Sequence, residues 1–305
     1  MGSNHLNNQF GSKESEQYEK YFNNPSLFAR QQWIGYNVGT FKIAKIQPHG
    51  YQLKVIDSIH KNKFNTIASA RQMGGSSIMA VYIAWYVLYN RNKKILIMSN
   101  NLEAGKRILE LVKTILFHYS VNSVFNYSFN INKDSKTELE LDNGCNIKVC
   151  VATADAGKGD VLDLLFIDNA AFIKKLGDIY MGLGMSISSG DGKVVLMSTP
   201  YDDSDFNLLA LNSRDNKDIN SIELTWKHNP KWDDNWYEQQ CLMWNHNQNR
   251  IDTELNCIIN YKEKSSKDKT ISLRIDSDTY NKMKIKAGGL QISDYLRYLI
   301  DHDLS

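Results

Sequence analysis

Two patterns of apolar and polar residues alternate along the middle of the chain. Short apolar runs with polar ends, such as Lys94–Ser99, predict buried strands, and apolar residues three or four positions apart, as over residues 101–119, predict amphipathic helices. Residues 138–152 alternate in polarity on both sides of an Asp-Asn-Gly turn, which predicts a hairpin. Because strands and helices alternate from about residue 40 to residue 200, we expect an α/β fold with a mostly parallel sheet flanked by helices.

The two ends of the chain differ from this middle part in composition. Residues 1–30 are rich in Asn, Ser and Glu, and they predict a flexible N-terminal arm before an α/β domain over residues 31–262. Residues 263–268 are polar and charged without apolar periodicity, so they predict a linker. Residues 269–305 regain a regular pattern and predict a separate small module.

A glycine-rich stretch at residues 69–77 has the pattern of a phosphate-binding loop without its lysine. Its sequence, Ser-Ala-Arg-Gln-Met-Gly-Gly-Ser-Ser, follows a short apolar run and opens a helical pattern, which is the context that such a loop needs. In the pattern G-x-x-x-x-G-K-[ST] the lysine reaches the β- and γ-phosphates, and Gly75 stands at that position. The glycines and serines alone also fit an ordinary turn.

A second candidate motif, at residues 161–169, is a buried strand that ends in an acidic residue. Asp168 is placed to hold a magnesium ion directly or through water, with a helix N-cap or a solvated strand end as the alternatives. The next position in such a motif carries the glutamate that polarises the attacking water, and here it is Asn169. An amide cannot act as a general base near neutral pH. The loss of two groups from one reaction predicts that the chain does not hydrolyse ATP and has no catalytic residues at these two positions.

Taken in their order along the chain, these motifs resemble the ATPase domain of large terminase subunits, the DNA-packaging motors of tailed phages. The resemblance covers about residues 30 to 260 and includes Lys158-Gly159, where the family often has Arg-Gly. It implies a P-loop NTPase fold. If nucleotide binding is retained, it implies contacts from Gln52, Arg71, Gln72, Gly74, Gly75, Ser76 and Ser77. It also implies a magnesium ligand at Asp168 and a motif that couples hydrolysis to domain movement at Ser198, Thr199 and Pro200. The terminase nuclease domain is expected to be absent, because only about 45 residues follow the predicted domain.

The C-terminal module combines one strand with two short helices. Residues 269–275 alternate strictly between polar and apolar, and two helical patterns follow, separated by Gly288-Gly289. So short a segment cannot bury a core alone, whereas two copies can. The module resembles the ribbon-helix-helix DNA-binding family over residues 269 to 303, which implies a homodimer whose paired strands enter the major groove. The DNA contacts implied are Thr270, Ser272 and Arg274 to bases and Ser293 to a phosphate. A hairpin that only dimerises, or a small cap on the body, remains the alternative.

Charge and cysteine usage narrow the class of protein further. The chain has 36 Lys and Arg against 34 Asp and Glu, and the excess of two lies after residue 260, so the body is neutral and is not a nonspecific DNA-binding surface. No apolar run approaches the roughly 20 residues that cross a membrane, and no signal peptide is visible. Four cysteines without metal-type spacing fit a reducing compartment, here the cytoplasm of an infected bacterial host.

The sequence therefore predicts a catalytically degenerate terminase-like protein. We expect it to dimerise and to bind double-stranded DNA through its C-terminal module, modulating or marking DNA for viral packaging or regulation. Viral packaging proteins are further candidate partners, and no cofactor is required beyond residual binding of ATP and magnesium. The alternative is an active variant packaging ATPase, a motor subunit without the nuclease domain, in which Arg71 or Lys158 replaces the lysine. A third reading is a structural protein whose C-terminal module only dimerises.

Overall fold

The structure is a computed structural model, and it describes most of the chain up to residue 260. The described residues are 19–37, 42–122, 129–153, 161–188, 191–216, 218–260, 277, 280 and 281. Two compact units divide the chain, the first over residues 1–261 and the second over residues 262–305.

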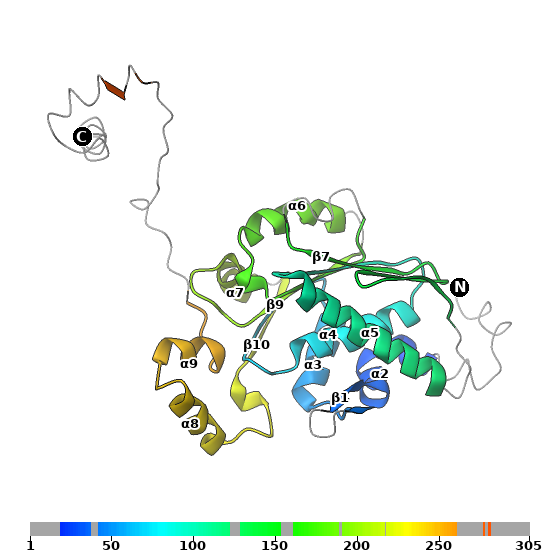
Figure 1. The fold of residues 1–305 in the computed structure, drawn as a ribbon, viewed down its shortest axis with the longest axis horizontal. Coiled ribbons are helices and arrows are strands. Elements are labelled where there is room, and N and C mark those ends of the chain that lie inside the picture. Colours follow the sequence, from blue (N-terminus) through cyan, green and yellow to red (C-terminus); the bar gives the residue numbers. More distant parts are fainter. Residues whose placement is uncertain are drawn as a thin grey trace. The chain divides into compact units, whose positions relative to one another are not determined.

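An eight-stranded sheet forms the centre of the first unit (Figure 1). Its strands in spatial order are β10 (Ile219–Leu224), β3 (Phe64–Ser69), β9 (Lys193–Ser198), β8 (Leu164–Asp168), β4 (Lys94–Ser99), β7 (Asn146–Val151), β6 (Glu138–Leu141) and β5 (Ile131–Asp134). From β10 to β7 all neighbours are parallel, and β6 and β5 continue the sheet antiparallel. The predicted α/β class and mostly parallel sheet are confirmed, as are the strand Lys94–Ser99 and the β6–β7 hairpin.

Helices cover both faces of this sheet (Figure 1). The helices are α2 (Pro25–Gln32), α3 (Gly50–Lys61), α4 (Gly75–Leu88), α5 (Leu102–Asn122), α6 (Leu176–Ser188), α7 (Asp205–Asp215), α8 (Asp234–Met243) and α9 (Gln248–Glu254), with 3-10 turns η1 (Ala170–Phe172) and η2 (Trp226–His228). In Figure 1, α6 and α7 lie on one side of the sheet, and α3, α4 and α5 lie on the other. A separate antiparallel pair is formed by β1 (Ile34–Asn37) and β2 (Lys42–Lys45).

Two apolar cores, one on each face, explain why the central strands are continuous apolar runs. Phe166 and Met197 belong to the core under α4 and α5, whereas Leu165 and Leu196 belong to the core under α6 and α7. Parallel strands covered on both faces need apolar residues at consecutive positions. Because side chains alternate along a strand, Asp168 lies on the same face as Phe166, toward α4. The fold therefore brings the acidic end of β8 to the start of α4.

Residues 19–30, which the sequence assigned to a flexible arm, contribute side chains to the core. Tyr21 and Phe28 are 1% and 0% exposed, and their rings meet edge to face with centroids 6.0 Å apart. Helix α2 begins after Asn24, whose side chain accepts a hydrogen bond from the Leu27 N–H at 2.9 Å. The prediction of a flexible arm over residues 1–30 is thus wrong for residues 19–30. The polar composition of this segment gave no indication that Tyr21 and Phe28 pack against the end of α4 and against α5.

Candidate functional site

The junction between β3 and α4 has the backbone of a phosphate-binding loop. Gln72 and Gly74 have φ angles of 63° and 80°, in the left-handed region that favours glycine. Gly74 is the N-cap of α4 and has no side chain, so the first N–H groups of the helix donate no hydrogen bond to an N-cap side chain. Ser76 and Ser77 occupy the first turn that follows. A free helix N-terminus of this kind favours anions.

Asp168 ends strand β8 and faces this first turn. Strand β9 lies between β3 and β8, so Asp168 and the loop belong to strands that are not adjacent. The Ser76 hydroxyl donates a hydrogen bond to the Asp168 carboxylate. Burial raises the pKa of Asp168 to about 6, although hydrogen bonds from the Asn169 N–H and Ser76 and the charge of Arg107 oppose the rise. Ser76 and Asp168 thus bring together a hydroxyl and a carboxylate, the two group types that hold magnesium in phosphate-binding loops.

Asn169 occupies the position where a general base would be expected. Its backbone is left-handed, with φ 54°, and its side-chain amide donates to Asp168 Oδ2 at 3.2 Å. Because an amide has no protonation equilibrium near neutral pH, this side chain cannot take a proton from water. What it can do is hold the Asp168 carboxylate.

Gly75 stands at the lysine position of the loop, and the Met197 side chain lies where a side chain at that position would begin. A Cβ atom built on Gly75 would lie well under 3.0 Å from Met197 Sδ and 3.5 Å from Met197 Cγ. Met197 is 4% exposed and stands on β9, level with Ile67 of β3 and Asp168 of β8. A side chain at position 75 would therefore begin inside the Met197 thioether.

Helix α3 holds the loop through contacts of Tyr51 and Gln52 with the Met73 carbonyl. Gln52 is buried, its Oε1 accepts from the His49 N–H at 2.9 Å, and its Nε2 lies 3.5 Å from the Met73 carbonyl. The Tyr51 hydroxyl donates to the same carbonyl at 2.9 Å. Both amide atoms of Gln52, one of the predicted nucleotide contacts, are thus engaged with main-chain groups.

Arg71, the candidate substitute for the lysine, points to α9. Its guanidinium forms an ion pair with Glu254, and its backbone N–H donates to the Glu254 carbonyl at 2.9 Å. The Ala70 N–H donates to the Leu224 carbonyl at 2.7 Å. The start of the loop is thereby attached to β10 and α9, and the Arg71 charge is neutralised away from the Ser76–Asp168 pair.

The predicted coupling motif ends β9 beside these residues. Ser198 is buried, and its hydroxyl has no hydrogen-bond partner among the described residues. Thr199 is half-buried and Pro200 is buried. By strand alternation Ser198 lies on the α6–α7 face, opposite to Met197. The motif therefore adjoins the loop in the sheet, but its serine does not face Asp168.

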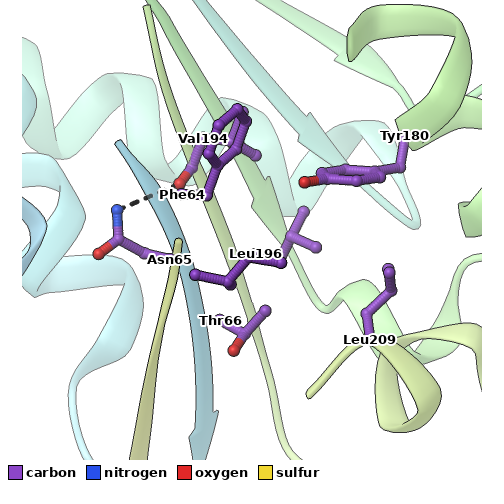
Figure 2. Close-up of a pocket in the computed structure, with 8 residues that line it drawn as sticks. Phe64, Asn65, Thr66, Tyr180, Val194, Leu196 and Leu209 are labelled. Carbon is purple, nitrogen blue, oxygen red and sulfur yellow. Dashed lines mark hydrogen bonds between the residues drawn. The ribbon is translucent and has the colours of Figure 1, made fainter. Parts of the chain in front are cut away.

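A cavity on the α6–α7 face offers no alternative site. Figure 2 shows it between β3, β9, α6 and α7, where the Asn65 side chain donates to the Val194 carbonyl at 3.3 Å. Its volume of about 10 Å³ is at the lower limit for a single water molecule. In the part of the chain that the structure describes, no three His, Cys, Asp or Glu side chains gather as a metal site, and no helix is long and apolar enough to span a membrane.

The predicted DNA-contacting residues lie outside the described residues. They are Thr270, Ser272, Arg274 and Ser293, and the same holds for Lys158-Gly159. Within the second unit the structure describes Ser277, Tyr280 and Asn281, which are helical.

Three side chains that shape the site carry no motif of their own in the sequence. Met197 immediately precedes Ser198-Thr199-Pro200 and would pass for an ordinary strand residue. Glu254 belongs to a short helix far along the chain, and Arg107 of α5 resembles any solvent-exposed helix charge. Sequence gives no signal for these contacts, because each arises from the register of strands or helices brought together by the fold.

Solved structures of phage large terminases are similar to this chain in architecture. The ATPase domain of the Thermus phage P74-26 large terminase aligns with 70% of this chain and 94% of its own length, with a TM-score of 0.55 and 16% identity. The large terminase of another thermophilic bacteriophage, in complex with ADP, aligns with 69% of this chain at a TM-score of 0.54 and 14% identity. The HK97 bacteriophage large terminase aligns with 88% at 0.54 and 13%.

These similarities establish the fold. The chain spans about half the length of the last two proteins, 53% of the ADP-bound terminase and 52% of the HK97 terminase. Compared with known protein families, the sequence itself matches none. The first unit therefore has the P-loop NTPase-type fold of the large terminase ATPase domain, at a level of sequence identity where the fold alone is shared.

Proposed function

We propose that this chain is a catalytically degenerate terminase-like protein, in which the ATPase fold serves as a scaffold and not as a motor. The observation that carries the proposal is the pair of replacements at one site, Gly75 for the lysine and Asn169 for the glutamate. Ser76 and Asp168 keep their relation to each other, so the scaffold survives while the groups for charge stabilisation and proton transfer are missing.

The competing function is an active variant packaging ATPase. The retained Ser76–Asp168 pair favours it, because that pair would hold magnesium in a working site. Against it stands the ion pair between Arg71 and Glu254, which directs the only cation of the loop itself away from the phosphate position. No cofactor is required in the proposed role.

DNA binding is assigned to the C-terminal module. The alternating sequence pattern of residues 269–275 and the two helical patterns that follow support a dimeric ribbon-helix-helix, in which Arg274 would donate two hydrogen bonds to a guanine. In this proposal the dimer binds double-stranded DNA in the cytoplasm of an infected bacterium and modulates or marks DNA for packaging or regulation. The terminase-like body would then present a surface to packaging proteins.

Steady-state ATP hydrolysis with magnesium, measured with and without DNA, tests the degenerate site. We expect no turnover above that of the Asp168→Ala variant. Robust turnover that Asp168→Ala abolishes, while Asp178→Ala on the exposed first turn of α6 leaves it intact, would overturn the proposal in favour of the active ATPase.

Selection of bound sequences from random and viral genomic DNA tests the DNA-binding part. The full chain should enrich a two-fold symmetric site, and Arg274→Ala should lose about 1–3 kcal/mol of discrimination at one base position while the dimer persists in light scattering. Lys264→Ala in the predicted linker is the matched control for a lost positive charge. A dimer that enriches no site would reduce the module to an oligomerisation device.

A further inference from the structure

We propose that Met197 prevents the loop from accommodating a phosphate-binding lysine at position 75, because its thioether occupies the volume where that side chain would begin. This inference rests on the proposed function and names the side chain that stands where the lysine would begin. Gly75 and Met197 then form a matched pair, in which a residue without a Cβ accommodates a long apolar side chain from the neighbouring strand.

The geometry leaves no room for both side chains in their present positions. A Cβ on Gly75 would lie well inside 3.0 Å of Met197 Sδ, an approach that real Cβ atoms essentially never show. The backbone of Met197 is fixed on both sides, since its strand pairs with β3 at Ile67 and with β8 at Asp168. Its side chain belongs to the core under α4 and α5, where close packing limits where the sulfur can move.

The overlap between a Cβ on Gly75 and Met197 Sδ lies where a phosphate-binding lysine would start. In a working loop the lysine at position 75 extends from the first turn of the helix to the β- and γ-phosphates. Met197 stands at the root of that path, directly opposite Asp168 in the pairing of β9 with β8. A thioether donates no hydrogen bond and carries no charge, so it cannot replace what the lysine supplies.

Two further contacts close the loop from its other sides. A Cβ on Gly74 would lie 2.9 Å from Gln52 Nε2, which shows how tightly that amide is packed beneath the turn. Arg71 is paired with Glu254 at the opposite end. The protein's own side chains thus pack against the turn before α4 at Gly74 and pair with Arg71.

A double-mutant cycle in the full chain tests the pair. The four proteins are the wild type, Gly75→Lys, Met197→Ala and the double variant, and the probe is a fluorescent N-methylanthraniloyl ATP with magnesium. We expect neither single variant to gain measurable affinity. The double variant should bind about 10- to 100-fold more tightly than either single variant, the worth of one charge-assisted hydrogen bond. Met197→Leu combined with Gly75→Lys is the matched control, since leucine keeps the volume filled and should give no gain.

Thermal unfolding of each variant shows whether it is folded, so that a missing gain in affinity is not mistaken for a failure to fold. Equal affinity of Gly75→Lys and the double variant would overturn the inference, because it would show that Met197 yields without cost. A folded double variant without gain would overturn it as well, since the obstacle would then lie elsewhere. Both results leave the proposed function standing if the wild type does not hydrolyse ATP, whereas wild-type turnover would refute the proposed function itself.

Discussion

Helices α3 and α4 both begin at a glycine, yet the two helix starts are built in opposite ways. At α3 the Gln52 side chain accepts a hydrogen bond from the His49 N–H, and a Cβ on Gly50 would meet nothing within 4 Å. At α4 the N-cap is the left-handed Gly74, and a Cβ on Gly75 would meet Met197. The glycine of α3 is therefore free to vary on steric grounds, whereas the glycine of α4 is required by a side chain from β9.

The comparison shows that the two helix starts differ in packing and in the charge that they face. The first turn of α4 still faces a buried carboxylate, Asp168, which the first turn of α3 does not. A buried charge is expensive unless it is paired or hydrogen-bonded. Asp168 is nevertheless present at the start of α4, next to the Gly75–Met197 contact. Three experiments test how the start of α4 differs from the start of α3.

The largest effect is expected from Asp168→Asn, through the pH dependence of stability. The pKa of Asp168 is about 6 in the folded protein and 3.8 in its ordinary environment. The folded state thus binds the Asp168 proton more tightly than the unfolded state does. Protonated Asp168 therefore contributes its full stability to the fold below about pH 4, and this contribution is lost as the pH rises through about 6. At pH 7 the ionised carboxylate costs about 3 kcal/mol, which Asp168→Asn should recover in part.

Urea unfolding between pH 4 and pH 8 measures this effect. The stability gained by Asp168→Asn should grow with pH over the range from about 4 to 6 and then level off. Asp178→Asn, which removes a carboxylate from the exposed first turn of α6, is the control for a general loss of charge. A gain that does not change with pH would contradict the burial of an ionisable Asp168 at the start of α4.

The next largest effect is expected from paired substitutions at the two glycines. Gly50→Ala should stabilise the protein by about 0.4–1 kcal/mol, because alanine loses less backbone entropy on folding and meets no neighbour. Gly75→Ala should instead destabilise it by about 1–3 kcal/mol, because the added methyl overpacks the Met197 side chain. Thermal unfolding of the two variants gives the opposite signs directly.

A third variant shows whether Met197 is the cause. In the Met197→Ala background the cost of Gly75→Ala should largely disappear, while the effect of Gly50→Ala should stay as it is in the wild type. If Gly75→Ala stabilises the wild type as much as Gly50→Ala does, the two helix starts are equivalent and the comparison fails.

Much of the fold was accessible from the sequence because the central strands follow a simple physical rule. Lys94–Ser99 could be predicted as a buried parallel strand, since consecutive apolar residues are required where both faces of a sheet are covered. The resemblance carried by the order of the motifs likewise implied that the loop and Asp168 belong to one P-loop NTPase fold. The structure brings Ser76 and Asp168 together.

The parts that could not be predicted depend on contacts between distant segments. Residues 19–30 seemed to belong to a polar arm, but Tyr21 and Phe28 find a place against α4 and α5 that composition cannot indicate. The absence of a lysine at Gly75 could be seen in the sequence, whereas the presence of Met197 in its place could not. A missing group is a local property of the sequence, and the side chain that fills its volume is a property of the fold.

The smallest effect is expected from the ion pair that joins the loop before α4 to α9. The Arg71 side chain is 54% exposed and that of Glu254 is 17% exposed, so solvent screens their ion pair. A double-mutant cycle of Arg71→Ala and Glu254→Gln, measured by urea unfolding, should give a coupling of about 0.2–1 kcal/mol that shrinks in about 1 M salt, where the roughly 3 Å Debye length screens it. The pair Arg214–Glu223, with comparable exposure and no contact with the loop, provides the reference cycle.

Equal couplings in the two cycles would mean that α9 is joined to the loop mainly by the backbone hydrogen bond from Arg71 to Glu254. A coupling well above the reference would instead mean that the ion pair holds the loop in its closed form. Glu254→Gln should then add to the affinity gained by the Gly75→Lys/Met197→Ala variant, because the Arg71 guanidinium would no longer be held against α9.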